Sequence, residues 1–174
     1  MKSSNLHYLQ TLAALLPSPY DEICRVVLFD QRFERGAGGS EHHHAYAGGL
    51  VDHTAEVVGS CERCNKNINW NILLTAAIWH DYHKIHDYAV FPDGKIEKLP
   101  YRNLIGHVVG GCTEFTAVAF EHRLDEEAIQ KIAHCLLSHH GRREWGSPVE
   151  PQTLEAFILH AADMLSAKGN VTPL

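Results

Sequence analysis

Histidine is unusually frequent in this chain, with 14 copies among 174 residues. Several histidines stand beside an aspartate, beside each other, or at the ends of apolar stretches with helical spacing. Imidazole and carboxylate groups together suit divalent Mn, Fe, Co, Ni or Zn better than Ca²⁺. The candidate metal ligands are His53, His80, Asp81, His107, His139, His140 and Asp163.

The adjacent pair His80-Asp81 indicates the chemistry that such ligands would support. Neighbouring residues of a helix point about 100° apart, so both side chains can reach one centre from different angles. The aspartate can bridge two metals while the histidine binds one. Two such metals lower the pKa of a bridging water and hold a phosphate oxygen. The pattern predicts metal-assisted hydrolysis of a phosphoester, with Asp81 as a catalytic residue.

Each candidate ligand has a plainer explanation when it is taken alone, because a buried histidine is more often a hydrogen-bonded core residue than a ligand. Taken together, that explanation requires five helices to bury an ionisable group each. Asp163 lies within the apolar segment 159–165, where an unpaired carboxylate is costly. We therefore favour the metal centre.

The spacing of apolar residues predicts the elements that position these ligands. Residues 89–91 and 96–98 flank a Pro-Asp-Gly-Lys turn and predict a short β-hairpin. Asp125 is a suitable N-cap and Pro151 a suitable first-turn residue. The predicted helices cover 6–16, 20–33, 50–64, 70–81, 104–122, 125–138 and 151–169. The fold class is all-α, a bundle of about six or seven helices with one small β-hairpin.

The composition limits the classes of partner. The net charge of −6 and the pI of about 6.1 argue against an extended nucleic-acid clamp, although metal ions can supply positive charge locally. No apolar run approaches the ~20 residues of a membrane span, and the N-terminus lacks a signal-peptide cleavage site. We expect a cytoplasmic protein that does not bind a membrane, and a homo-oligomer is compatible with the sequence.

The five cysteines fit an intracellular protein without disulfides, because their number is odd. Cys61 and Cys64 form a single CxxC pair. A zinc site of that type usually needs a second pair, which the sequence lacks. We interpret the two cysteines as small residues one turn apart on a buried helix.

Several strings in order resemble the HD superfamily of metal-dependent phosphohydrolases. The order His53, His80-Asp81, Asp163 is typical of that superfamily. Residues 43–54 read His-His-Ala-Tyr-Ala-Gly-Gly-Leu-Val-Asp-His-Thr, which resembles the start of the HD domain in the YhaM-type 3′-to-5′ exoribonuclease family. Residues 103–107, 137–141, 146–149 and 155–156 continue the resemblance, which runs from about 43 to 168. It implies an HD core, 43–168. Together with the N-terminal helical hairpin, 1–36, that the apolar spacing predicts, we expect a single HD domain, 1–174.

The resemblance also implies roles for the ligands. His53, His80, Asp81 and Asp163 would hold a first divalent metal. Asp81, His107, His139 and His140 would hold a second. Lys84, three residues after Asp81, would contact the scissile phosphate or the attacking water and stabilise developing charge. Three-metal relatives carry a glutamate where this chain has Gly49, which favours two metals.

Two departures from the family pattern concern the substrate. The exonucleases carry an OB-type nucleic-acid-binding domain before the HD domain, whereas the residues before His43 read as a helical hairpin. The usual small residue after His-Asp-Ile is replaced by His83. The residues expected on the substrate side are Lys84, Arg142, Arg143, Tyr46, His43, His44, Tyr101 and Arg102, with Asn103 and Trp145 as further candidates.

Three functions remain open at this point. The first is a phosphodiesterase or nuclease that acts on short oligonucleotides with 3′-to-5′ polarity, or on cyclic nucleotides. The second is a nucleotide phosphohydrolase, either a 5′-nucleotidase or a dNTP triphosphohydrolase. The third is a nonhydrolytic nucleotide-binding sensor. An HD scaffold can also carry a di-iron oxygenase, but Lys84 favours hydrolysis.

Overall fold

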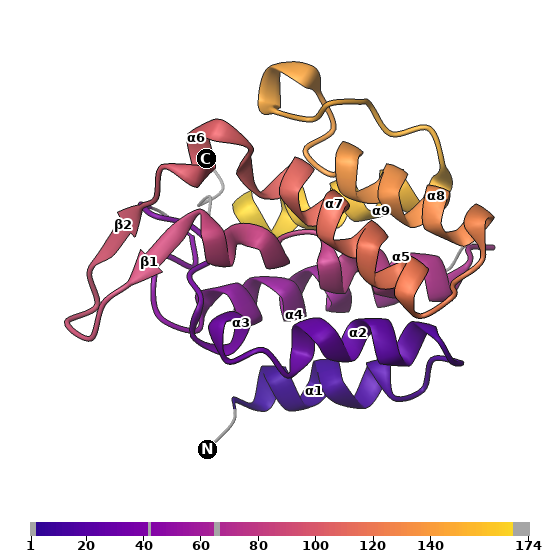
Figure 1. Cartoon of the computed structure of the whole chain (residues 1–174), viewed down its shortest axis with the longest axis horizontal. Coiled ribbons are helices and arrows are strands. Elements are labelled where there is room, and N and C mark those ends of the chain that lie inside the picture. Colours follow the sequence, from indigo (N-terminus) through magenta and orange to yellow (C-terminus); the bar gives the residue numbers. More distant parts are fainter. Residues whose placement is uncertain (1–2, 42, 65–66, 169–174) are drawn as a thin grey trace.

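The computed structural model describes residues 3–41, 43–64 and 67–168 as a stack of helices with a small β-hairpin at one side (Figure 1). The helices and strands are α1 (Ser4–Ala13), α2 (Tyr20–Leu28), α3 (Gln31–Arg35), α4 (Gly49–Glu62), α5 (Trp70–Trp79), η1 (Tyr82–His86), β1 (Tyr88–Val90), β2 (Ile96–Lys98), α6 (Tyr101–Leu104), α7 (Gly106–Glu121), α8 (Glu126–Ser138), η2 (Arg143–Trp145) and α9 (Leu154–Lys168). Here η1 and η2 are 3₁₀ helices. The predicted all-α class with one hairpin is confirmed.

The ends of the predicted helices differ from those in the structure by a few residues, as three of them show. The predicted helix 20–33 is divided into α2 and α3, because the Asp30 side chain accepts a hydrogen bond from the Arg32 amide and caps a new helix. The predicted helix from 104 begins at Gly106, after the short α6. α9 begins at Leu154 instead of Pro151, with Thr153 Oγ1 accepting from the Ala156 amide. Its predicted end at Gly169 lies outside the described residues.

α5 forms the centre of the bundle. Its sequence is apolar on all sides, and every residue from Ile72 to Trp79 is buried, as expected for a helix enclosed by others. It contacts α2, α4, α8 and α9. The Asn69 side chain caps its start by accepting from the amides of Asn71 and Ile72. The helix therefore delivers His80 and Asp81, which directly follow it, into the interior.

The N-terminal helices join the same core. α1 packs on α4 and α2 packs on α5, and Leu9 and Ile23 belong to one buried hydrophobic cluster with residues of α4, α5, α7, α8 and α9. The strands β1 and β2 pair antiparallel, with Ala89 opposite Glu97. Within the described part of the chain, each helix is too short or too polar to cross a lipid bilayer.

Candidate metal centre

The first group of ligands lies where α4, α5 and α9 meet. His53 comes from α4, His80 follows α5, and Asp163 comes from α9. His53 Nε2 lies 3.1 Å from His80 Nε2 and 3.2 Å from Asp163 Oδ1. One donor atom from each residue lies within 4.8 Å of the other two. These distances are compatible with three ligands around one metal ion.

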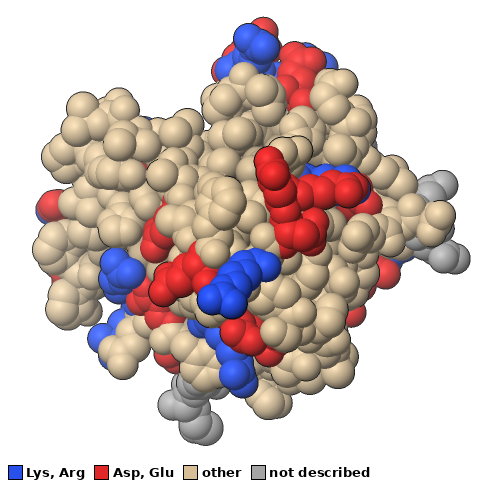
Figure 2. Space-filling view, turned by 45° about the vertical axis from the view of Figure 1, so that its right-hand side comes forward, with Lys and Arg blue, Asp and Glu red and all other residues tan. Residues whose placement is uncertain are grey.

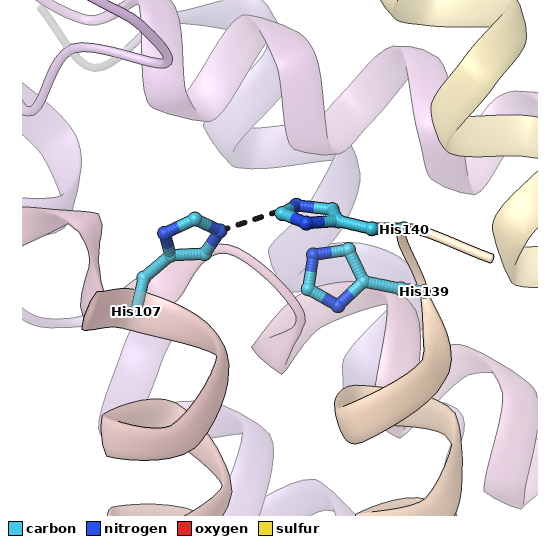
Figure 3. A group of neighbouring side chains, drawn as sticks. All are labelled: His107, His139 and His140. Atoms are coloured by element: carbon cyan, nitrogen blue, oxygen red, sulfur yellow. Dashed lines mark hydrogen bonds between the residues drawn. The ribbon is translucent and has the colours of Figure 1, made fainter. Parts of the chain in front are cut away.

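The second group comes from α7 and the end of α8. His107 lies in the first turn of α7, while His139 and His140 directly follow α8. Figure 3 shows the three rings turned toward one another, with His107 Nε2 at 3.4 Å from His140 Nε2. Their donor atoms also lie within 4.8 Å of one another. Two separate three-residue groups are thus present.

Asp81 lies between the two groups. Its Oδ2 is 3.1 Å from His53 Nε2 and 3.5 Å from His80 Nε2. Its Oδ1 is 3.4 Å from His107 Nε2 and 3.7 Å from His139 Nε2. One carboxylate therefore faces the first group with one oxygen and the second group with the other.

Two atoms of this centre are buried without a hydrogen-bond partner among the described residues, namely Asp81 Oδ1 and His139 Nε2. Such atoms cost free energy unless something satisfies them. Both are donor atoms that point into the cluster of imidazoles and carboxylates. The donor set and these two atoms fit divalent transition metals.

The protonation states also suit metal binding. Burial, together with the neighbouring His140 and His80, holds the pKa of His139 well below its usual value. Burial lowers the pKa of His80 and of His140 as well. Although burial raises the pKa of a carboxyl, Lys84 and His80 hold the pKa of Asp81 well below its usual value. Neutral imidazole and ionised carboxylate are the forms that bind metals.

His53 differs from the other histidines of the centre. Burial opposes its charged form, but hydrogen bonds to Asp163 and Asp81 raise the pKa of His53 to about 9. Its Nδ1 contacts Ser166 Oγ at 2.9 Å, and that hydroxyl donates to Glu56 Oε2. A metal at this site would have to displace a proton from His53.

The ring nitrogens that face away from the centre are held by the fold. His80 Nδ1 donates to the Ala77 carbonyl at 2.8 Å, and His139 Nδ1 donates to the Leu136 carbonyl at 2.7 Å. His140 Nδ1 donates to the Trp145 carbonyl at 3.0 Å. Each bond places the proton on Nδ1 and leaves the Nε2 lone pair for the centre.

Lys84 lies beside the two groups, in η1. Its Nζ is 2.5 Å from Asp81 Oδ2 and donates to the Gly38 carbonyl at 2.8 Å. Burial disfavours the charged ammonium, but Asp81 raises the pKa of Lys84. A protonated donor therefore stands at the edge of the candidate metal centre.

A cavity of about 480 Å³ opens onto this centre. The predicted substrate-side residues His43, His44 and Lys84 line it. Trp145, which sequence reasoning also proposed, lines it too, and Arg142 stacks on the Trp145 ring at 4.9 Å from the ring centroid. The full lining is Gly38, His43, His44, His53, Lys84, His140, Trp145, Asp163, Met164, Ala167 and Lys168.

Five of the eight predicted substrate-side residues, Arg142 included, do not line this cavity, and neither does the further candidate Asn103. The Tyr46 hydroxyl donates to Asp52, and Tyr101 lies against the rings of His83 and His86. Arg143 lies in a different hollow with His134, and Arg102 lies in a hollow beside His107.

Sequence reasoning missed Asp87. This residue is fully buried, and its carboxylate accepts from His107 Nδ1. A buried aspartate between a 3₁₀ helix and a strand has no periodic signal in the sequence. Sequence reasoning also missed the group formed by His83, His86 and Glu114.

The two cysteines of the CxxC pair lie at the end of α4. Cys61 is buried in α4 and Cys64 follows the end of that helix. The groups of potential ligands found among the described residues contain no cysteine.

The charge pattern of the surface can be followed in part in Figure 2. On the face shown there, acidic and basic side chains are intermixed and much of the surface is uncharged. No continuous basic track crosses that face, in keeping with the net charge of −6.

Comparison with known proteins confirms the predicted resemblance. The family model described as HD domain matches residues 50–168. The protein named 3′-5′ exoribonuclease YhaM from Listeria welshimeri is 34% identical over 133 residues, which are 75% of this chain and 42% of that protein. Proteins of the same name from Bacillus pumilus and Bacillus subtilis are 33% and 32% identical, over 82% and 76% of this chain and 46% and 42% of their own lengths.

The matched region thus spans less than half the length of these curated relatives. No solved structure gives a significant match.

Proposed function

Because the chain belongs to the HD-domain family, we propose that it is a phosphodiesterase that uses two metals and removes nucleotides from the 3′ end of short oligonucleotides. The observation that supports this proposal most directly is the position of Asp81. Its two oxygens face two separate groups of ligands. This is the arrangement that a bridging carboxylate requires between two metal ions.

In this proposal, His53, His80 and Asp163 hold one metal, and His107, His139 and His140 hold the other. Asp81 contributes an oxygen to each. When bound, divalent metals of the Mn, Fe, Co, Ni or Zn class supply a water of lowered pKa and positive charge next to the phosphate. The buried Nδ1–carbonyl hydrogen bonds keep the imidazoles oriented while the substrate binds and leaves.

Lys84 and the cavity wall act on the substrate. The Lys84 ammonium donates a hydrogen bond to a non-bridging oxygen of the scissile phosphate and stabilises the charge that develops there. The terminal base stacks on the Trp145 ring, and the Arg142 guanidinium lies over the same ring. His43 and His44 lie on the cavity wall and are available to the sugar-phosphate.

The size of the cavity supports action on a strand end. A cavity of about 480 Å³ suits one nucleotide, which favours removal of a terminal residue over internal cleavage. The relatives named above are 3′-5′ exoribonucleases. Their name supports the polarity and the RNA substrate proposed here.

A second candidate function follows from the same volume. A cavity that accepts one nucleotide also suits a free mononucleotide, so the alternative is a nucleotide phosphohydrolase acting on nucleoside monophosphates or dNTPs. The two candidates share the metal centre and differ in the bond that is cleaved.

The test combines metal analysis of protein purified without chelator with a substrate panel of 3′- and 5′-labelled RNA oligomers, cyclic nucleotides, nucleoside monophosphates and dNTPs. We expect nucleoside 5′-monophosphates released from RNA 3′ ends. Release of inorganic phosphate from monophosphates, or of triphosphate from dNTPs, would establish the alternative instead.

The matched variants are Asp81→Ala and Asp93→Ala, the second in the exposed turn of the hairpin. We expect Asp81→Ala to lose the metals of the candidate centre and the activity, and Asp93→Ala to keep both. Full activity of Asp81→Ala after exhaustive chelation would refute the metal mechanism.

A further inference from the structure

A third group of potential ligands lies apart from the candidate centre. His83 and His86 come from η1, and Glu114 comes from α7. One donor atom from each lies within 4.8 Å of the other two. We propose that these three residues form an additional binding site for one divalent transition-metal ion of the Zn²⁺ class.

The geometry of η1 brings the two histidines together. A 3₁₀ helix has three residues per turn, so side chains at positions i and i+3 eclipse. The rings of His83 and His86 accordingly have centroids 4.5 Å apart. An α-helical segment would turn these side chains further apart. The HxxH spacing is therefore suited to a shared ion because this segment is a 3₁₀ helix.

The packing of η1 against α7 adds the carboxylate. Glu114 Oε2 lies 3.2 Å from His83 Nε2. Gly110 and Gly111 of α7 permit this approach, since a Cβ built on Gly110 would lie 2.6 Å from His83 Nδ1. The His83 side chain is thus packed against the backbone of α7, and only 8% of this side chain is exposed.

The polar contacts of His83 leave room for a ligand role. Its Nδ1 is buried without a hydrogen-bond partner among the described residues. A histidine kept only for the fold normally has both nitrogens paired. Among the described residues, the buried His83 imidazole therefore makes its polar contact through Nε2, and the partner is Glu114, a second potential ligand.

Access and charge are compatible with a cation. Glu114 has 32% of its side chain exposed, so an ion can reach the group from solvent. The positive charge of Arg32, which acts on Glu114, is paired with the Asp30 carboxylate at 2.6 Å. Two imidazoles and one carboxylate form a common ligand set for Zn²⁺ and leave a fourth position for water.

The proposed ion has a structural consequence for the candidate centre. Lys84 lies between His83 and His86 in the chain, and its Nζ contacts Asp81. An ion held by both histidines and by Glu114 would fasten η1 to α7 on both sides of this lysine. The proposal does not depend on which reaction the centre catalyses.

The experiment is a metal titration of the full chain after removal of metals by chelation. Zn²⁺ is added at micromolar concentration and bound ions are counted by mass spectrometry, and Co²⁺ is added in parallel for its visible absorption. The variants are His86→Gln and Glu114→Gln. The matched control is His122→Gln. His122 Nδ1 lies 3.2 Å from Glu22 Oε2, the same distance as between His83 Nε2 and Glu114 Oε2, and His122 belongs to none of the ligand groups found among the described residues.

We expect His86→Gln and Glu114→Gln each to bind one ion fewer than the unmodified chain, with an unchanged circular dichroism spectrum. His122→Gln should bind the same number as the unmodified chain. Asp81→Ala should keep the ion at the third group, which separates this site from the candidate centre. Equal stoichiometry in the unmodified chain, His86→Gln and Glu114→Gln would overturn the proposal.

Discussion

Asp87 Oδ2 lies 2.9 Å from His107 Nδ1, and the same oxygen accepts from the His107 backbone amide at 3.3 Å. The carboxylate is fully buried beneath the candidate metal centre. It fixes both the orientation of the His107 ring and the nitrogen that carries the proton. His107 Nε2 is thereby directed toward Asp81.

Replacing Asp87 with Asn should weaken metal binding about 10- to 100-fold, the usual cost of losing an outer partner of a histidine ligand. An amide that donates to Nδ1 would favour the tautomer with its proton on Nε2, which blocks the ligand position. Competitive titration with a chromogenic chelator measures the effect. Asp93→Asn is the control, and unchanged affinity in Asp87→Asn would argue against His107 as a ligand.

Replacing Lys84 with Met should reduce kcat by about 10²- to 10³-fold, the range seen when one donor to a developing oxyanion is removed. Metal content should stay as in the unmodified chain, because Lys84 belongs to neither group of metal ligands. Lys84→Arg should recover part of the rate because it restores a charged donor. A Met variant with normal kcat would exclude the role proposed for Lys84.

Replacing Trp145 with Ala should raise KM for RNA about 5- to 150-fold, since stacking of a base on an aromatic ring contributes about 1–3 kcal/mol. Trp145→Phe should lose much less. The His140 hydrogen bond goes to the backbone carbonyl of Trp145 and stays available in both variants. Steady-state kinetics with an oligomer and with a 3′-abasic oligomer provide the measurement, and equal losses for the two substrates would contradict stacking.

The cysteines should differ in their reaction with a disulfide reagent at pH 8. Burial raises the pKa of Cys24, Cys61 and Cys135 to about 12 each, so roughly one in ten thousand of each would be the reactive thiolate at that pH. Cys64 and Cys112 are both partly exposed, but burial raises the pKa of Cys112, so Cys64 should react first.

All five thiols should react in denaturant, and Cys64→Ser should remove the fast phase of the native protein. Rapid reaction of all five thiols in the native state would contradict the buried positions.

The elements that the sequence predicted best are those with a long apolar pattern. The apolar run that ends at His80-Asp81 is central in the bundle because it carries apolar residues on all sides, and such a helix is stable only when other helices enclose it. The predicted ligands gather at one place because they follow or lie on such helices. Which of them bind metal stays a prediction.

The residues that could not be predicted depend on contacts between segments with no shared periodicity. Tyr101 begins α6 and Arg143 begins η2, which are too short to show a periodic pattern, and their surroundings are set by the packing of η1 and by the segment after α8. Asp87 acquires its role only when the end of η1, which it follows, is placed beside the start of α7. Local sequence carries no information on these contacts.

The Nδ1 bonds of His80 and His139 have a further effect on the helices themselves. Each bond reaches the carbonyl three residues earlier, in the last turn of α5 or α8, where helix carbonyls otherwise lack partners. The imidazoles therefore act as C-terminal caps as well as candidate ligands. A ring that turns away from the centre would also uncap its helix, so fraying of these two helix ends and disorder of the ligands should occur as one event.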